Sequence, residues 1–255
     1  MTLSKNNVKF IKSLRLKKFR QKYNNFIVEG DKMVRELLVQ SPEKVVALYA
    51  LESWLAGTED ARRVSSDKCF SVSPAGLKRV SNLNTPNQVL AVAEIPEVEV
   101  DPQQVKHTLS LFLDGIQDPG NLGTILRIAD WFGIHYVFLS PDCVDPYNPK
   151  VVQASMGALL RVHCVEASIG TLCEQHPGLP VYGAVMEGEN VFTAELKGAS
   201  GMIVIGSEGK GISPEAERYL SHRIAIPPAA HSRADSLNAA IATGILCAVF
   251  LARVR

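Results

Sequence analysis

The sequence lacks the features that mark secreted, membrane-spanning and metal-binding proteins. It has five cysteines, an odd number, and no C-x-x-C pair of the kind that builds zinc sites or redox motifs. No apolar run approaches the roughly 18 residues that a transmembrane helix needs, and no apolar stretch follows the basic N-terminus as a secretory signal requires. We therefore expect a cytoplasmic protein with reduced, mostly buried cysteines and no metal.

Two common nucleotide-binding fingerprints are also missing. After the apolar stretch Met202–Ile205, the segment Gly206–Gly211 reads G-S-E-G-K-G, so its glycines follow G-x-x-G-x-G. This is neither the dinucleotide fingerprint G-x-G-x-x-G nor the phosphate loop G-x-x-x-x-G-K-[ST]. A nicotinamide enzyme or a nucleoside triphosphatase is therefore disfavoured, although three glycines in six residues suggest backbone wrapped around a ligand.

Acidic residues are absent from the first 23 positions, which carry eight Lys or Arg. The rest of the chain has 19 basic against 26 acidic residues, a net charge of −7 within an overall +1. A cationic segment on an acidic chain is what attraction to a phosphate backbone requires, since each Lys or Arg near a phosphate releases counterions. A solvated helix face remains the alternative, because blocks of like charge also occur on surfaces that bind nothing.

The 255 residues are 46% apolar and 21% charged, as in a globular protein of one or two domains. We expect strands over 26–28, 44–50 and 88–95, a helix from Asp31, as its N-cap, to about Gln40, and another helix near Trp54. A turn-rich stretch covers 71–87. The polar segment 96–107, with Pro96 and Pro102, predicts a linker.

From residue 108 the chain alternates between expected strands and helices. Strands are predicted over 109–113, 136–139, 180–185, 202–205 and 224–226, with helices over about 122–132 and 236–254. This alternation predicts a mostly parallel sheet with covering helices. We place an N-terminal domain at 1–98 and a second domain at 105–255.

Polar side chains gather where these strands meet helices, which is where open α/β sheets bind ligands. Asn121, Gly123 and Arg127 follow the 109–113 strand, whereas Ser236 and Asn238 precede the last helix. The structural alternatives are helix capping for Asn121, Ser236 and Asn238, and a surface ion pair for Arg127. With the glycine-rich loop after 202–205 there are three such corners in one domain, which makes a shared site the better interpretation.

Taken together, N-x-G-x-x-x-R at 121–127, G-S-E-G-K-G at 206–211 and S-L-N at 236–238 resemble the three signature motifs of the SpoU (TrmH) family of RNA ribose 2′-O-methyltransferases, in the family's order. The segment Asp145–Ala158 is similar to the family's stretch after the second strand. The similarity covers about 108–255. Residues 5–95 resemble the ribosomal-protein-like RNA-binding domain that precedes this domain in many relatives.

The resemblance implies a trefoil-knotted α/β methyltransferase domain in the SPOUT superfamily, a smaller N-terminal α/β RNA-binding domain, and a homodimer with sites near its interface. It also implies that S-adenosylmethionine is held largely by backbone groups at positions matching Gly206, Ile226 and Leu237, with Ala184 and Ser236 beside them. On this interpretation a side chain at Gly206 would fill space that the adenosine needs. Relatives run from Ile-Pro-Met through a glycine-containing link to S-L-N, whereas here Pro228 replaces Met and the link at 229–235 is longer and has no glycine.

The matched positions also carry expected catalytic roles. Arg127 is the family-matched group for activating the ribose hydroxyl, but a guanidinium keeps its proton at neutral pH and is a poor base, which favours an anchor for phosphate or incipient alkoxide. Asn121, Glu208, Ser236 and Asn238 would orient the ribose and Arg127, with the Glu208 carboxylate holding the guanidinium. Substrate capture is assigned to the basic segment, through Lys17, Lys18 and Arg20.

Three other functions compete with this prediction. A catalytically silent RNA-binding protein of ribosome assembly would keep the fold but has no need of the first and third motifs. A knotted enzyme that methylates a base would want a different acid or base group. Transfer RNA is the alternative substrate to ribosomal RNA, which we prefer by analogy with relatives that share the N-terminal domain.

Overall fold

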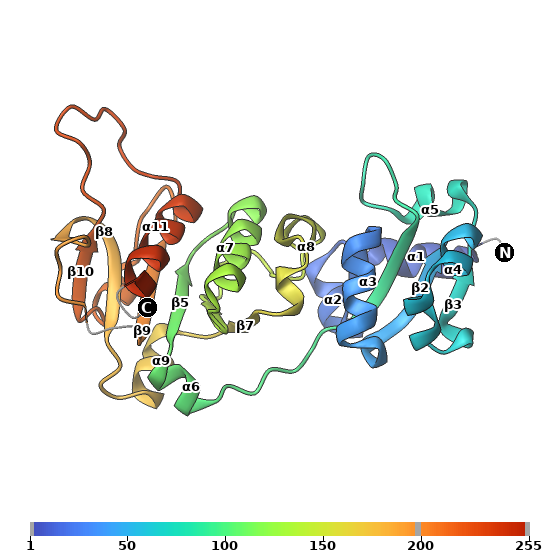
Figure 1. The fold of residues 1–255 in the computed structure, drawn as a ribbon, viewed down its shortest axis with the longest axis horizontal. Coiled ribbons are helices and arrows are strands. Elements are labelled where there is room, and N and C mark those ends of the chain that lie inside the picture. The colour runs from blue at the N-terminus through green and yellow to red at the C-terminus, as the bar shows by residue number, and fades with distance from the viewer. Residues whose placement is uncertain (1–2, 197–199, 253–255) are drawn as a thin grey trace. The chain divides into compact units, whose positions relative to one another are not determined.

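The computed structural model describes residues 3–196 and 200–252, and its chain divides into two compact units. The first unit comprises Met1–Glu97 and Asp145–Leu160, and the second comprises Val98–Val144 and Arg161–Arg255. Figure 1 shows the elements of each unit in chain colours.

A four-stranded mixed sheet forms the middle of the first unit. Its strands in spatial order are β1 (Asn25–Glu29), β4 (Val89–Glu94), β2 (Val45–Ala50) and β3 (Cys69–Ser71). β4 runs antiparallel to both of its neighbours, and β3 runs parallel to β2. The three strands expected from the sequence are confirmed, whereas β3, with only three half-buried residues, gave no apolar signal.

Six α-helices belong to this unit among the residues that the structure describes. They are α1 (Lys5–Ser13), α2 (Lys17–Tyr23), α3 (Asp31–Gln40), α4 (Glu52–Gly57), α5 (Pro74–Val80) and α8 (Pro149–Ser155). The core is built where Val8, Ile11 and Leu14, at helical spacing along α1, pack with apolar residues of the sheet such as Ile27 and Leu90.

Two local expectations were wrong in this unit. Gly30, with φ at 104°, is the N-cap of α3, and the Asp31 side chain instead accepts hydrogen bonds from Arg35 and Trp54. The stretch expected to be turns contains α5, which begins because the Ser73 hydroxyl accepts from the backbone N–H of Gly76 and Pro74 fits the first helical position.

The segment Asp145–Leu160 lies within the first unit although it follows β6 in the chain. Its helix α8 packs against β1, and the rings of Phe26 and Tyr147 lie 4.9 Å apart between centroids. Sequence alternation alone placed this segment in the second domain. It belongs to the first unit because it contacts residues that lie more than 100 positions earlier in the sequence.

The second unit is built on a six-stranded sheet in which all paired strands are parallel. Its spatial order is β10 (His222–Ala225), β8 (Val181–Asn190), β9 (Gly201–Gly206), β5 (Leu109–Asp114), β6 (Tyr136–Leu139) and β7 (His163–Glu166). The prediction of an α/β fold with a mostly parallel sheet is confirmed. The knot stays a prediction.

The helices of this unit are α6 (Pro102–His107), α7 (Pro119–Phe132), α9 (Ile169–Gln175), α10 (Pro214–Glu217) and α11 (Ala239–Ala252). α6 occupies half of the expected linker, because the Asp101 side chain caps it and Pro102 starts it. α11 packs against α7 and begins three residues after the predicted start at Ser236, while its predicted end at Val254 lies outside the described residues. None of the helices described in residues 3–196 and 200–252 is long and apolar enough to cross a membrane.

Candidate active site

The three polar corners of the second unit lie at one edge of its sheet. β5 and β9 are parallel neighbours whose last residues, Asp114 and Gly206, are paired in register. The buried Asp114 carboxylate accepts a 2.6 Å hydrogen bond from the backbone N–H of Ser213, which ties the glycine-rich loop to the end of β5. Sequence reasoning missed this link, since an Asp that ends a strand carries no signal of its partner.

A cavity of about 560 Å³ opens beside this edge, a size typical of small-molecule sites. All five positions expected to hold the cofactor line it: Ala184, Gly206, Ile226, Ser236 and Leu237. They come from the middle of β8, the end of β9 and the segment between β10 and α11. The structure thus brings together residues that lie up to 53 positions apart in the sequence.

The inner wall of the cavity is apolar and its rim is charged. Ile205 and Ile224 at strand ends and Leu246 from α11 form part of the wall, while Glu208 and Lys210 belong to the rim. The long link between β10 and α11 also lines the cavity through Ala229, Ser232 and Ala234, and Figure 1 shows it as an extended loop. The departure from the family pattern therefore lies directly at the cavity.

Gly206 is required by the loop itself. A Cβ built at this residue would lie 2.2 Å from the backbone carbon of Gly211 and 2.3 Å from the nitrogen of Ile212. Ser207 and Gly211 exchange two backbone hydrogen bonds of 3.1 and 2.9 Å, which hold the chain folded back at that distance. The backbone of Gly211 and Ile212 is thus a sufficient reason for glycine at this position. That Gly206 also leaves room for adenosine stays a prediction.

Three side chains from the three motifs form a hydrogen-bonded chain. The Asn121 amide donates to the Glu208 carboxylate, and its oxygen accepts from the Asn238 amide at 2.9 Å. Asn121 is free to do so because Asp118 is the N-cap of α7 and accepts from the Asn121 backbone N–H at 2.8 Å. The capping interpretation of Asn121 was wrong.

Asn238 combines capping with the network. Its side-chain oxygen accepts from the backbone N–H groups of Ala240 and Ile241 at 3.0 and 3.2 Å, so it caps α11 while its amide nitrogen reaches Asn121. Ser236 is exposed in the preceding loop, lines the cavity and does not start the helix. The capping alternative was thus right for Asn238 and wrong for Ser236.

Arg127 stands apart from this network. It lies six residues after Asn121 on α7, about 240° around the helix, and its side chain is exposed. Within residues 3–196 and 200–252 its guanidinium forms no hydrogen bond or ion pair, which excludes the surface ion pair there. The Glu208 carboxylate contacts Asn121, so the expectation that it holds Arg127 was wrong for this structure.

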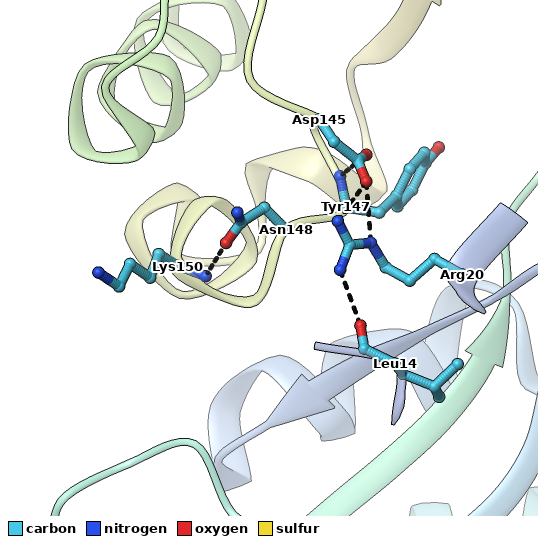
Figure 2. Close-up of polar contacts among 6 residues, drawn as sticks. All are labelled: Leu14, Arg20, Asp145, Tyr147, Asn148 and Lys150. Atoms are coloured by element: carbon cyan, nitrogen blue, oxygen red, sulfur yellow. Dashed lines mark hydrogen bonds and ion pairs between the residues drawn. The ribbon is translucent and has the colours of Figure 1, made fainter. Parts of the chain in front are cut away.

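The residues expected to contact RNA lie on α2 of the first unit, and one of them is not available. The Arg20 side chain is 2% exposed. Its Nε and Nη2 donate to Asp145 Oδ2 at 2.8 and 2.5 Å, and Nη1 donates to the Leu14 carbonyl at 2.7 Å (Figure 2). Arg20 is therefore a buried structural anchor, whereas Lys17 and Lys18 are exposed on the same helix.

A parallel α/β sheet with a cavity at the carboxyl ends of its strands, bordered by a glycine-rich loop and a network of amides and a carboxylate, defines a small-molecule-dependent enzyme domain. Residues 108–248 match the family model of the SpoU rRNA methylase family, and residues 5–91 match that of the MRM3-like substrate binding domain. The chain belongs to the SpoU rRNA methylase family. The resemblance seen in the three motifs is confirmed.

Known proteins agree with this placement. A TrmH-family protein from Porphyromonas gingivalis is 40% identical, with a TM-score of 0.88 over 99% of this chain and 100% of its own. An rRNA methyltransferase from Sinorhizobium meliloti, solved with AdoMet bound, is 27% identical, with a TM-score of 0.85 over 98% and 95%. The 23S rRNA (guanosine(2553)-2′-O)-methyltransferase RlmP of Bacillus subtilis is 29% identical over 94% of this chain and 93% of its own.

Proposed function

We propose that this protein transfers a methyl group from S-adenosylmethionine to a ribose 2′-hydroxyl in ribosomal RNA. The observation that carries the proposal is the convergence of the five expected cofactor positions on one cavity, with the Asn121–Glu208–Asn238 network beside it. The Bacillus subtilis relative, named for 2′-O-methylation of 23S rRNA, and the AdoMet-bound Sinorhizobium meliloti relative support the reaction and the cofactor. We also propose that it works in the cytoplasm.

The cavity suits S-adenosylmethionine in size and chemistry. Backbone groups at Gly206, Ile226 and Leu237 offer hydrogen bonds to an adenosine, and the apolar wall accommodates its ring. When bound, S-adenosylmethionine supplies a methyl group made electrophilic by the sulfonium charge. Glu208 and Lys210 at the rim of the cavity offer charges of both signs, which suits a ligand that carries a sulfonium, an ammonium and a carboxylate group.

The network positions the ribose. Asn121 is held at both ends of its amide, so its orientation is fixed, and its second N–H remains to donate to a sugar oxygen. Asn238 is fixed by its bonds to the start of α11 and likewise keeps one N–H. Arg127 supplies a permanent positive charge that anchors a phosphate or stabilises the developing alkoxide, since its guanidinium does not act as a base.

We also propose that the protein works as a homodimer through α7 and α11. α11 has no charged residue in its 14 positions, and its outer face exposes Ile241 (56%) and Ala248 with half-buried Ile245 between them. On α7, Trp131 is 83% exposed, one turn beyond Arg127. An uncharged helix face of this kind is typical of self-association, and a second copy there would bring its own groups towards Arg127.

The first unit is proposed to capture the RNA. Its residues match a substrate-binding domain, and the eight Lys and Arg of the N-terminal segment lie on its first two helices, apart from Arg15 in the turn between them. Seven of these remain for the task, because Arg20 is buried.

The test is transfer of labelled methyl from S-adenosylmethionine to deproteinised total RNA, followed by digestion to nucleosides and chromatography. Label in a 2′-O-methylnucleoside is expected and identifies the nucleotide. Label on a base would instead establish a base methyltransferase. No transfer to ribosomal or transfer RNA, together with no heat of S-adenosylmethionine binding in titration calorimetry, would establish a silent RNA-binding protein.

A further inference from the structure

The short helix α2 carries two parallel rows of side chains that the capture of phosphates alone does not explain. Phe19 and Tyr23 are four residues apart and therefore lie on one face of the helix, and their rings are nearly parallel, 12° between planes with centroids 6.2 Å apart. Tyr23 is 41% exposed and Phe19 is half-buried. Such rings on a surface helix offer flat apolar area to a ligand.

A row of lysines runs beside the aromatic row. Lys18 and Lys22 are also four residues apart, each one position before an aromatic residue. Their ammonium groups lie 5.0 Å from the centroid of the Phe19 ring and 5.4 Å from that of Tyr23. Cation–π contacts at exposed sites are weak, so a phosphate can draw these ammonium groups away.

The helix is held rigidly from beneath. The buried Arg20 guanidinium bonds to the Leu14 carbonyl just before α2 and to the Asp145 carboxylate, as Figure 2 shows, and the Phe10 ring packs edge-on against Tyr23 at 5.2 Å. Phe10 itself rests on the core of the first unit. The two rows are therefore presented in a fixed orientation, which lowers the entropy lost on binding.

We propose that Phe19, Tyr23, Lys18 and Lys22, here called the α2 platform, stack unpaired bases of the RNA substrate and hold the phosphates beside them. This rests on the proposed function. A single strand carries bases on one side and phosphates on the other, which matches one aromatic row and one lysine row. Paired bases bury their faces within the helical stack, so the platform selects loops, bulges or ends over duplex RNA.

The test measures binding of the full-length protein to fluorescein-labelled RNA by anisotropy, with a 12-nucleotide single strand and a duplex of equal length. The double variant Phe19→Leu/Tyr23→Leu removes the rings but keeps apolar volume. Its affinity for the single strand is expected to fall roughly tenfold or more, with the salt dependence unchanged and duplex binding unaltered. Tyr23→Phe, which keeps the ring, is expected to bind as the wild type does.

The lysine row gives a separate readout. Lys18→Gln/Lys22→Gln is expected to flatten the salt dependence of binding by about two counterions while the preference for single strands persists. Wild-type single-strand affinity in the leucine variant, or an equal loss for single strand and duplex, would overturn the platform. Methyl transfer to total RNA by the wild type is scored independently, so failure of the platform and failure of the proposed function are told apart.

Discussion

Single residues of this chain gain their importance from distant partners. Gly206 is an example, because a Cβ at this position would collide with the backbone of Gly211 and Ile212. Gly206→Ala is expected to weaken S-adenosylmethionine binding roughly tenfold, because relieving such an overlap costs about 1–3 kcal/mol and displaces the loop that lines the cavity. Gly209→Ala is the matched control, since its added Cβ meets nothing within 4 Å. Calorimetry on both variants checks this, and equal affinities would refute it.

Arg127→Ala is expected to reduce methyl transfer by about 100-fold or more, the loss typical of a group that stabilises transition-state charge. Its affinity for S-adenosylmethionine should remain, because Arg127 does not line the cavity. Single-turnover transfer and calorimetry on the same preparation separate the two effects. Wild-type turnover in the variant would remove Arg127 from the catalytic residues.

Arg20 is expected to stabilise the fold of the first unit. Arg20→Met leaves the nearly buried Asp145 carboxylate with only the Tyr147 backbone N–H as a donor and removes the donor to the Leu14 carbonyl, so the free energy of unfolding of the first unit should fall by about 3–5 kcal/mol. Lys9→Gln, on an exposed position of α1, should change it by less than about 0.5 kcal/mol. Urea denaturation measures both, and a similar small change in the two variants would argue against the anchor.

Residue-level prediction reached furthest where the pattern was local, although cofactor binding itself stays a prediction. The five cofactor positions could be assigned because each motif occupies a few consecutive residues, and the fold then carries them to one cavity. It failed for Arg20, whose cationic neighbours suggested RNA while its partner lies 125 residues away. It also missed the close approach of the Gly211 and Ile212 backbone to Gly206, since a fold-back of backbone leaves no mark in composition.

At the scale of elements, Asn238 at the start of α11 has two roles, as the cap of the helix and as a hydrogen-bond donor to Asn121. Asn238→Ala removes both the cap and the bond to Asn121, so it should cost about 1 kcal/mol of stability and most of the methyl transfer. Asn238→Asp keeps the capping oxygens but loses the donor to Asn121. It should melt like the wild type and transfer methyl slowly. Equal activity of the aspartate variant and the wild type would show that Asn238 only caps.

Long, apolar elements could be predicted from the sequence and short, capped ones could not. The strands β5, β6 and β9 are fully or almost fully buried, so their apolar runs stand out. The helices α5, α6 and α8 have six or seven residues and start at a Pro after a capping Ser, Asp or Asn. The same residues are typical of turns, and tertiary contacts decide between the two.

At the scale of the whole molecule, the uncharged face of α11 predicts self-association. Ile241→Glu should shift the protein from dimer to monomer in sedimentation equilibrium, because a charge on this face cannot be buried against a second copy without a partner. Val39→Glu is the control, since Val39 is exposed to a similar degree (52%) on α3 of the first unit. A wild-type monomer at micromolar concentration would contradict the proposed homodimer.

The central claim is tested most directly by mapping ribose methylation in ribosomal RNA from the source organism with and without the gene. A 2′-O-methyl group protects the adjacent linkage from alkaline cleavage, because the 2′-hydroxyl is the attacking nucleophile. We predict one protected linkage that becomes cleavable in the deletion strain and is protected again by the wild-type gene, but not by one that encodes Arg127→Ala. Identical cleavage profiles in the two strains would contradict ribose methylation of ribosomal RNA by this protein.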